Sequence, residues 1–221
     1  TSAEAALELA AEIKASPHLR FDGVQFYCGV HQHIAAYEDR RAGIVERTQY
    51  LKDIIEKLSA AGAAPGIITG GGTGTHRIDA ELGVFTDLQV GSYVFMDRQY
   101  LDCDLTGSGT APYQTALFVD ARVVSANTPG MATIDAGFKA LSTDGGAPSI
   151  VSGAPEHSVY HFMGDEHGAV ICRGAQFVPG ASVTLGAPHC DPTVNLYDSY
   201  HVVRGDTLID IWQVTARGRS R

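Results

Sequence analysis

The sequence predicts an α/β segment followed by an all-β domain, with the boundary near residue 100. Over residues 1–100, helix-like and strand-like runs alternate, which is the rhythm of βα units around a parallel sheet or barrel. Over residues 101–221, short apolar runs are broken by Gly, Pro, Asp and Asn, and no long helical pattern occurs. A chain of 221 residues can bury one larger and one smaller core of this kind.

Periodicity and helix-ending residues place each element of the first domain. Thr1 and Ser2 can cap a helix at the start of the chain, and Gly62 suits the end of a second helix. The runs between the helices are short, apolar and partly aromatic, as expected of buried strands. The expected order is a helix over 3–16, a strand over 19–29, a helix over 37–61, a strand over 65–69 and a strand over 87–97.

The second domain is expected to consist of β-strands and hairpins. The β-rich runs cover residues 115–127, 158–172 and 201–216. Two of them are interrupted by turn sequences, GDEHG at residues 164–168 and RGDT at residues 204–207. Each of these turns predicts a hairpin.

Composition argues against several classes of function. The formal net charge of −9 repels phosphate, which argues against nucleic acid or an anionic membrane as the main partner. No apolar run approaches the roughly 20 residues that a membrane helix requires. The four cysteines lie far apart and form no CxxC pair, which favours reduced thiols and a cytoplasmic location, with two disulfides as the alternative.

The start of the chain is unusual. Residue 1 is not Met, no signal peptide is present, and a helical pattern begins at once. We expect the sequence to be the later part of a longer polypeptide.

A glycine-rich run, TGGGTGT over residues 69–75, follows an apolar strand directly. Glycines allow positive φ and close backbone approach, so successive N–H groups could surround a phosphate, and threonine hydroxyls add donors. The run lacks the lysine of a Walker A loop and the GxGxxG spacing of a dinucleotide-binding turn. The alternative is a tight turn of small residues. The candidates for phosphate contact are Gly72, Thr73, Gly74 and Thr75.

Three possible metal ligands stand together in GAPHCDPTVNLYD, residues 186–198. On an extended strand, His189 and Asp191 would point to one side while Cys190 turns away, because strand side chains alternate. Imidazole with carboxylate suits Mn, Zn, Fe or Mg with open positions. On residue types alone, an exposed Asp-Pro turn with a hydrogen-bonded histidine is the simpler interpretation. An oxygenase-type iron triad would need His201 as its second histidine.

Gln25 and Tyr27 lie on one side of the expected strand VQFYCG. An amide in a buried strand needs a hydrogen-bond partner, which is either a ligand or the next strand. The residues alone leave both alternatives open.

The order of these sequence motifs resembles the order of motifs in one known protein family. FDGVQFYCGVHQH, GGGTGT, LQVGSYVFMD and PHCDPTVNL are similar to successive motifs of the D-threonine aldolase and D-serine dehydratase family, over almost the whole chain. The resemblance implies a pyridoxal phosphate enzyme of the alanine-racemase-like fold. Residues 1–100 would be the later part of its TIM-type (βα)8 barrel, and residues 101–221 a β-sandwich or β-barrel domain that carries the metal site.

The resemblance also implies which metal ligands to expect. Dehydratases of the family typically carry H-x-C and hold zinc, whereas aldolases carry H-x-D and use manganese, magnesium or a similar divalent ion. His189-x-Asp191 is of the second kind, so both residues are expected to be ligands and His189 to be catalytic. Cys190 matches neither ligand position.

For the cofactor, Gln25, Tyr27 and Tyr93 join the glycine run as binding candidates, since all three lie in motifs that carry the resemblance. The family's Schiff-base lysine, and the arginine that faces the pyridine nitrogen, have no counterpart in this sequence. We expect them upstream of Thr1 or in a companion chain, and a homodimer is a further expectation. The lysines that are present are Lys14, Lys52, Lys57 and Lys139.

The expected reaction is retro-aldol cleavage of D-threonine and related D-β-hydroxy-α-amino acids to glycine and an aldehyde. The cofactor would supply the electron sink and the metal would acidify the β-hydroxyl, with the general base left open. One alternative is dehydration of D-serine or D-threo-3-hydroxyaspartate. The other is a non-catalytic metal- or cofactor-binding fragment.

Overall fold

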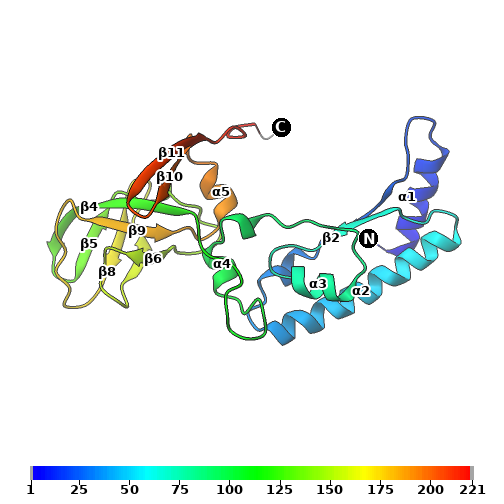
Figure 1. Ribbon diagram of the computed structural model, residues 1–221, viewed down its shortest axis with the longest axis horizontal. Coiled ribbons are helices and arrows are strands. Elements are labelled where there is room, and N and C mark those ends of the chain that lie inside the picture. The colour runs from blue at the N-terminus through cyan, green and yellow to red at the C-terminus, as the bar shows by residue number, and fades with distance from the viewer. Residues whose placement is uncertain (1, 220–221) are drawn as a thin grey trace. The chain divides into compact units, whose positions relative to one another are not determined.

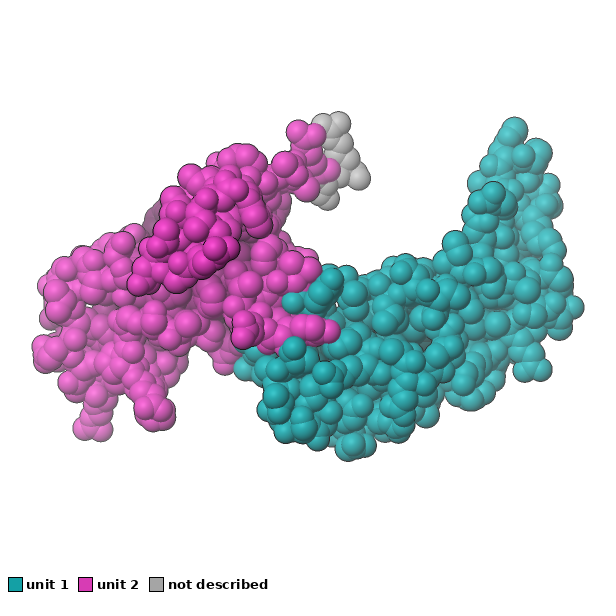
Figure 2. All heavy atoms as spheres, in the orientation of Figure 1, with its two compact units in different colours: residues 1–93, 100–112 teal, residues 94–99, 113–221 magenta. Residues whose placement is uncertain are grey.

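The computed structural model describes residues 2–219 of the chain. The chain divides into two compact units, Thr1–Tyr93 with Tyr100–Pro112 and Val94–Gln99 with Tyr113–Arg221 (Figures 1 and 2). The first unit is α/β and the second is built mainly of β-strands, which confirms the predicted fold class. Thr1, which was offered as part of a helix cap, lies outside the described residues.

The α/β unit contains a parallel sheet in the order β1-β2-β3, with helices between its strands. Phe26 pairs with Gly70 and Gly70 with Leu88, so the carboxyl ends of all three strands meet at one edge. The glycine run begins at this edge. The elements are α1 (Ala3–Ala15), β1 (Gly23–Phe26), η1 (Gly29–His33), α2 (Tyr37–Ala60), β2 (Ile67–Gly70), α3 (His76–Leu82), β3 (Asp87–Leu88) and η2 (Ser92–Val94), followed by α4 (Arg98–Leu101).

Local sequence explains the two long helices, which confirm the predicted ones. The side chain of Ser2 caps α1 by accepting a hydrogen bond from the N–H of Ala5. Helix α2 buries Ile54 and Leu58 on the face that packs against α1. It ends where Gly62 takes a left-handed φ of +70°, which a residue with a side chain adopts at a cost.

Other expectations for this unit are wrong in extent. The strand expected over 87–97 is paired only at Asp87–Leu88, and its continuation turns into η2. The run expected as a buried strand over 19–29 is partly exposed and forms the four-residue β1. Helix α3 has too few residues for an apolar period to be recognised, and Gly83 at φ +63° ends it.

The all-β unit is a curled six-stranded antiparallel sheet in the order β6-β9-β4-β5-β8-β7, with a separate hairpin of β10 and β11. Along β4, Val119, Ala121 and Val123 are buried and alternate with exposed residues, the pattern of a sheet with one covered face. The strands are β4 (Phe118–Thr128), β5 (Met131–Ile134), β6 (Ser149–Ser152), β7 (Val159–Phe162), β8 (Gly168–Ile171), β9 (Ser182–Gly186), β10 (Ser199–Arg204) and β11 (Thr207–Gln213).

Both predicted hairpins are confirmed. GDEHG connects the antiparallel strands β7 and β8, and the glycine and aspartate of RGDT connect β10 and β11. No disulfide joins the four cysteines, all of which lie among the described residues. Within residues 2–219, no helix has the length and apolar character needed to cross a membrane.

Candidate functional site

The HCD segment lies in the all-β unit at the start of the short helix α5 (Cys190–Val194) (Figure 1). His189 precedes the helix in an extended conformation, while Asp191 lies in the first helical turn. The segment is therefore not the extended strand that the alternation argument assumed, because Pro192 in the first turn and Asp191 near the positive end of the helix both favour a helix start. The two side chains nevertheless converge, with His189 Nε2 3.2 Å from Asp191 Oδ2.

The imidazole of His189 lies between two carboxylates. Its Nδ1 atom is 2.6 Å from Oδ2 of Asp144, and its Nε2 atom faces Asp191. The ring is 27% exposed, whereas more than half of each carboxylate side chain is exposed. Partial burial raises the pKa of Asp144, but the hydrogen bond and charge of His189 outweigh it and hold that pKa below the ordinary value.

Two buried hydroxyls fix the backbone of His189. Ser142 Oγ accepts a hydrogen bond from the N–H of His189 and donates to its carbonyl oxygen, at 3.3 and 3.0 Å. Thr193 Oγ1 donates to the same carbonyl at 2.7 Å and accepts from the N–H of Ser142. The histidine is therefore held at its backbone as well as at its ring.

Cys190 faces the interior and is only 2% exposed. Its backbone N–H donates to Oδ2 of Asp97 at 2.8 Å, and Asp97 is itself buried. The thiol lies 3.7 Å from Oδ2 of Asp191, a weak contact. The arrangement leaves His189 and Asp191, which are more accessible, as the pair that can reach an ion.

This segment provides two candidate metal ligands, His189 and Asp191. Across residues 2–219, no group of three or more His, Cys, Asp or Glu side chains is arranged to hold a metal. One imidazole nitrogen and one carboxylate oxygen fit a divalent ion whose other positions are filled by water or substrate. His201 is an exposed residue of β10, and among residues 2–219 no third ligand completes a cluster with this pair, so the iron triad gains no support.

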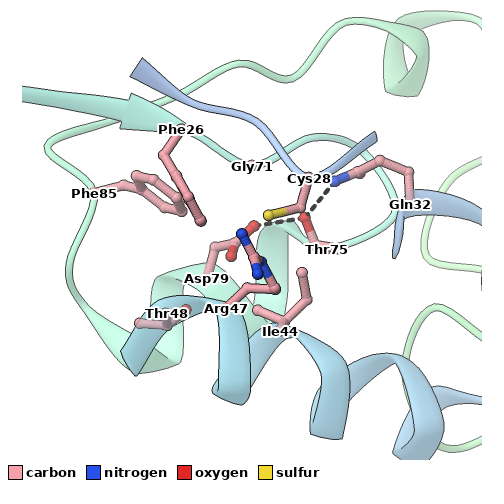
Figure 3. A pocket seen from close by; sticks show the side chains of 10 residues that line it. All are labelled: Phe26, Cys28, Gln32, Ile44, Arg47, Thr48, Gly71, Thr75, Asp79 and Phe85. Atoms are coloured by element: carbon pink, nitrogen blue, oxygen red, sulfur yellow. Dashed lines mark hydrogen bonds between the residues drawn. The ribbon is translucent and has the colours of Figure 1, made fainter. Parts of the chain in front are cut away.

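The glycine run of the α/β unit wraps the fully buried side chain of Gln32 (Figure 3). Gln32 Nε2 donates to Thr75 Oγ1 at 3.0 Å, and Gln32 Oε1 accepts from the N–H of Gly74 at 3.1 Å. Thr75 Oγ1 in turn donates to the buried carboxylate of Asp79 at 2.5 Å. A side chain at Gly74 would overlap the backbone of Gln32, so this glycine is required by the approach of η1.

Most N–H groups of the run are used within the protein. Gly72 donates to Thr75 Oγ1, Gly74 to Gln32, and Thr75 to the carbonyl of Gly72. Beside them, burial raises the pKa of Asp79, although the hydrogen bond from Thr75 opposes this. The cavity behind the run measures about 10 Å³, which is room for about one water molecule and not for a cofactor (Figure 3).

Two aromatic candidates flank the glycine run. The N–H of Tyr93 donates to Thr73 Oγ1 at 3.1 Å, and a Cβ atom built on Gly72 would lie 3.3 Å from the ring of Tyr27. Both tyrosine side chains are about half exposed. Gln25 is exposed, and its amide donates to Gln89 Oε1 at 3.3 Å, so the partner found is the segment that follows β3.

Known proteins resemble this chain over almost its whole length. Residues 116–203 match a family model described as "Putative serine dehydratase domain". The 3-hydroxy-D-aspartate aldolase of Paracoccus denitrificans (strain Pd 1222) is 36% identical over 99% of this chain and 57% of its own length. The D-threonine aldolase of Arthrobacter sp. is 38% identical over 97% of this chain and 56% of its own length. The chain belongs to the D-threonine aldolase and D-serine dehydratase family.

Solved structures confirm the alanine-racemase-like fold. The crystal structure of D-threonine aldolase from Filomicrobium marinum superimposes with a TM-score of 0.90 at 34% identity, over 97% of this chain and 58% of that one. An alanine-racemase-like protein from Idiomarina loihiensis superimposes with a TM-score of 0.79 at 18% identity, over 95% of this chain and 59% of that one. The chain thus spans somewhat over half the length of the relatives that it matches.

None of the four lysines of this aldolase-family chain lies on a strand. Lys14, Lys52 and Lys57 are on the helices α1 and α2, where Lys14 donates to the carbonyl of Gly62. Lys139 is exposed and pairs with Glu166. Their positions give no sign of a covalent cofactor anchor on a barrel strand.

Three residues that organise the glycine run and the HCD segment of this family member escape a sequence-based search. Gln32 and Asp79 organise the glycine run from η1 and α3, and Asp144 reaches the ring of His189 from 45 residues earlier in the chain. The glycine pair that follows Asp144 is the only local signal at that position, and it indicates a turn and not a site.

Proposed function

We propose that this chain is the later part of a lyase that cleaves D-threonine and related D-β-hydroxy-α-amino acids to glycine and an aldehyde. The observation that carries the proposal is the convergence of His189 Nε2 and Asp191 Oδ2 at 3.2 Å, in an H-x-D order. The names of two relatives, D-threonine aldolase and 3-hydroxy-D-aspartate aldolase, support the same reaction type.

His189 and Asp191 would hold a divalent ion such as manganese or magnesium. Such an ion lowers the pKa of a hydroxyl that it binds and stabilises the alkoxide, which is what cleavage of the Cα–Cβ bond requires. The contribution of this chain is to keep both ligands in place: Ser142 and Thr193 hold the backbone of His189, and Asp97 holds the backbone of Cys190 between the two ligands. His189 is our candidate for the catalytic residue closest to the substrate hydroxyl.

Pyridoxal phosphate would supply the sink for the electrons left at Cα. The edge of the parallel sheet that carries the glycine run suits the phosphate end of such a cofactor, since phosphate sites of βα barrels lie at the carboxyl ends of the strands. Because three of the four N–H groups in Gly72–Thr75 are already donated within the protein, Tyr27 and Tyr93 are needed as further contacts at this edge. Gln25 is exposed on the same sheet and remains a candidate.

The lysine that binds the cofactor covalently would lie outside this sequence. We propose that an upstream barrel segment, or a companion chain, supplies the Schiff-base lysine, and that the complete enzyme is a homodimer. Borohydride reduction in the presence of pyridoxal phosphate tests the first point. We expect no label on Lys14, Lys52, Lys57 or Lys139 of a catalytically active sample, and a label on any of these would contradict the proposal.

Product analysis tests the reaction. The complete enzyme, with Mn²⁺ and pyridoxal phosphate, is expected to release glycine and acetaldehyde from D-threonine, and glycine and glyoxylate from 3-hydroxy-D-aspartate. Dehydration is the second candidate, favoured by the family model that matches residues 116–203. It would release ammonia and a 2-oxo acid without glycine, and that outcome would overturn the aldolase assignment.

A further inference from the structure

Asp144 contacts the nitrogen of His189 that faces away from Asp191. Asp144 Oδ2 lies 2.6 Å from Nδ1, and Asp191 Oδ2 lies 3.2 Å from Nε2. An aspartate carboxylate at the pH of the cell only accepts hydrogen bonds, so the short contact requires the proton of a neutral imidazole to be on Nδ1. The lone pair of Nε2 is then available to an ion that Asp191 also binds.

Contacts on both sides of Asp144 hold its loop in place. Before it, Ser142 forms hydrogen bonds to both backbone groups of His189 and to Thr193. After it, a Cβ atom on Gly145 would lie 2.8 Å from the carbonyl carbon and oxygen of Pro188, so only glycine lets the backbone pack this closely. Asp144 is therefore held opposite the ring by contacts that do not involve its own carboxylate.

Free histidine in water favours the opposite tautomer, with the proton on Nε2, which would block the nitrogen next to Asp191. A carboxylate or carbonyl that accepts the other ring N–H is the usual way in which proteins set the tautomer and orientation of a metal-binding histidine and raise its basicity. Asp144 is in the position that this role requires.

We propose that Asp144 is a positioning residue, which keeps Nε2 of His189 unprotonated and aimed beside Asp191 and so sets the affinity of this chain for a divalent ion. The inference rests on the proposed function, since it takes His189 and Asp191 as the ligand pair. It assigns to Asp144 no contact with the metal or the substrate.

Metal titration of the complete protein, with its upstream segment, tests the effect on affinity. Mn²⁺ binding is measured by the loss of the free-ion electron paramagnetic resonance signal. We expect Asp144→Ala to weaken binding about 10- to 100-fold, the range for loss of a carboxylate behind a ligand histidine. Asp144→Asn should weaken it less, because its amide oxygen still accepts the N–H bond. Asp206→Asn, in the exposed turn between β10 and β11, removes the same charge and should leave binding unchanged.

The tautomer of His189 gives a readout that needs no metal. In ¹⁵N NMR spectra of the metal-free protein carrying Asp191→Ala, no carboxylate at residue 191 competes for the ring proton. Nδ1 of His189 should then carry the proton with Asp144 or Asp144→Asn, whereas Asp144→Ala should shift the population towards protonated Nε2. A merely structural role of Asp144 would change the unfolding temperature without changing the tautomer. Thermal unfolding of each variant separates the two effects.

The outcomes distinguish this inference from the proposed function. If both Asp144 variants bind Mn²⁺ within twofold of the wild type while His189→Ala does not bind it, the positioning role is wrong and the metal site stands. If His189→Ala and Asp191→Ala bind as the wild type does, or the wild type does not bind Mn²⁺, the ligand pair is wrong and the inference fails with it. If Asp144→Ala does not fold, Asp144→Val, which also lacks an acceptor, replaces it, and an affinity within twofold of the wild type overturns the inference.

Discussion

The backbone N–H of Cys190 donates to the carboxylate of Asp97 across 2.8 Å, and the two residues are only 2% and 1% exposed. A buried carboxyl group needs hydrogen-bond partners, because a polar group left unpaired in the interior costs free energy. The contact fixes the residue between His189 and Asp191 without using its side chain. Cys190 thus anchors the segment, and its neighbours remain available as ligands.

Replacing Asp97 tests this anchor. Asp97→Ala leaves the buried N–H of Cys190 without this acceptor, and we expect a loss of about 2 kcal/mol in the free energy of unfolding, measured by urea denaturation. Mn²⁺ affinity should fall as well, because the ligand segment loosens. Asp97→Asn keeps an acceptor oxygen and should lose less. Equal stability of the alanine variant and the wild type would show that the contact is not an anchor.

Single alanine variants of the HCD segment test the ligand pair. His189→Ala and Asp191→Ala should each weaken Mn²⁺ binding by about 100-fold and abolish most of the cleavage rate of the complete enzyme, since Lewis-acid stabilisation is worth several kcal/mol. Cys190→Ala should keep the metal and cost about 1 kcal/mol in unfolding free energy, as a modest packing change does. Loss of metal in Cys190→Ala, with its retention in Asp191→Ala, would falsify the H-x-D assignment.

Metal preference is expected to follow the second ligand. Asp191→Cys replaces a hard carboxylate oxygen by a soft thiolate, so the ratio of zinc to manganese affinity should rise. Competition titrations of the variant and the wild type measure that ratio. Asp191→Asn is the control, since it keeps an oxygen donor. An unchanged ratio in the cysteine variant would mean that residue 191 does not touch the ion.

Gly74 is predicted to be the glycine of the run that tolerates substitution least. A Cβ atom there would overlap the backbone of Gln32, which cannot move aside as a side chain end can, so Gly74→Ala should lose about 3 kcal/mol in unfolding free energy. Gly91→Ala is the matched control: it meets no atom within 4 Å and should change stability by less than about 1 kcal/mol. Equal losses in the two variants would contradict the close packing of η1 against the run.

The buried carboxylate of Asp79 predicts a pH-dependent stability. Burial raises its pKa in the folded state above the ordinary value of 3.8, despite the hydrogen bond from Thr75. The folded state then binds the proton more tightly than the unfolded state, so stability is greatest at low pH and falls as the pH rises through the raised pKa. Asp79→Asn removes this dependence while keeping an acceptor for Thr75. In urea denaturation from pH 3.5 to 8, the free energy of unfolding of the variant should rise relative to that of the wild type as the pH rises. A difference that stays constant over this range would contradict the prediction.

The sequence by itself determined the features that depend on neighbouring residues. Caps and apolar periods predict the helices at Ala3–Ala15 and Tyr37–Ala60, and turn residues predict the two hairpins. The same patterns predict the change from an α/β unit to an all-β unit. The H-x-D pair could also be found, because the order and types of its residues are visible in the chain. Its local conformation could not, since the segment starts the helix α5, whereas the argument that both side chains share one side assumed an extended strand.

Only the tertiary structure decided what surrounds those residues. Asp144 and His189 are 45 positions apart, Gln32 and Gly74 are 42, and Asp97 and Cys190 are 93. No local pattern links such partners, because hydrogen bonds across this separation depend on how strands and loops pack and not on propensity or period. The glycine run shows the difference: its composition indicated close backbone approach, and only folding brings the buried Gln32 against Gly74.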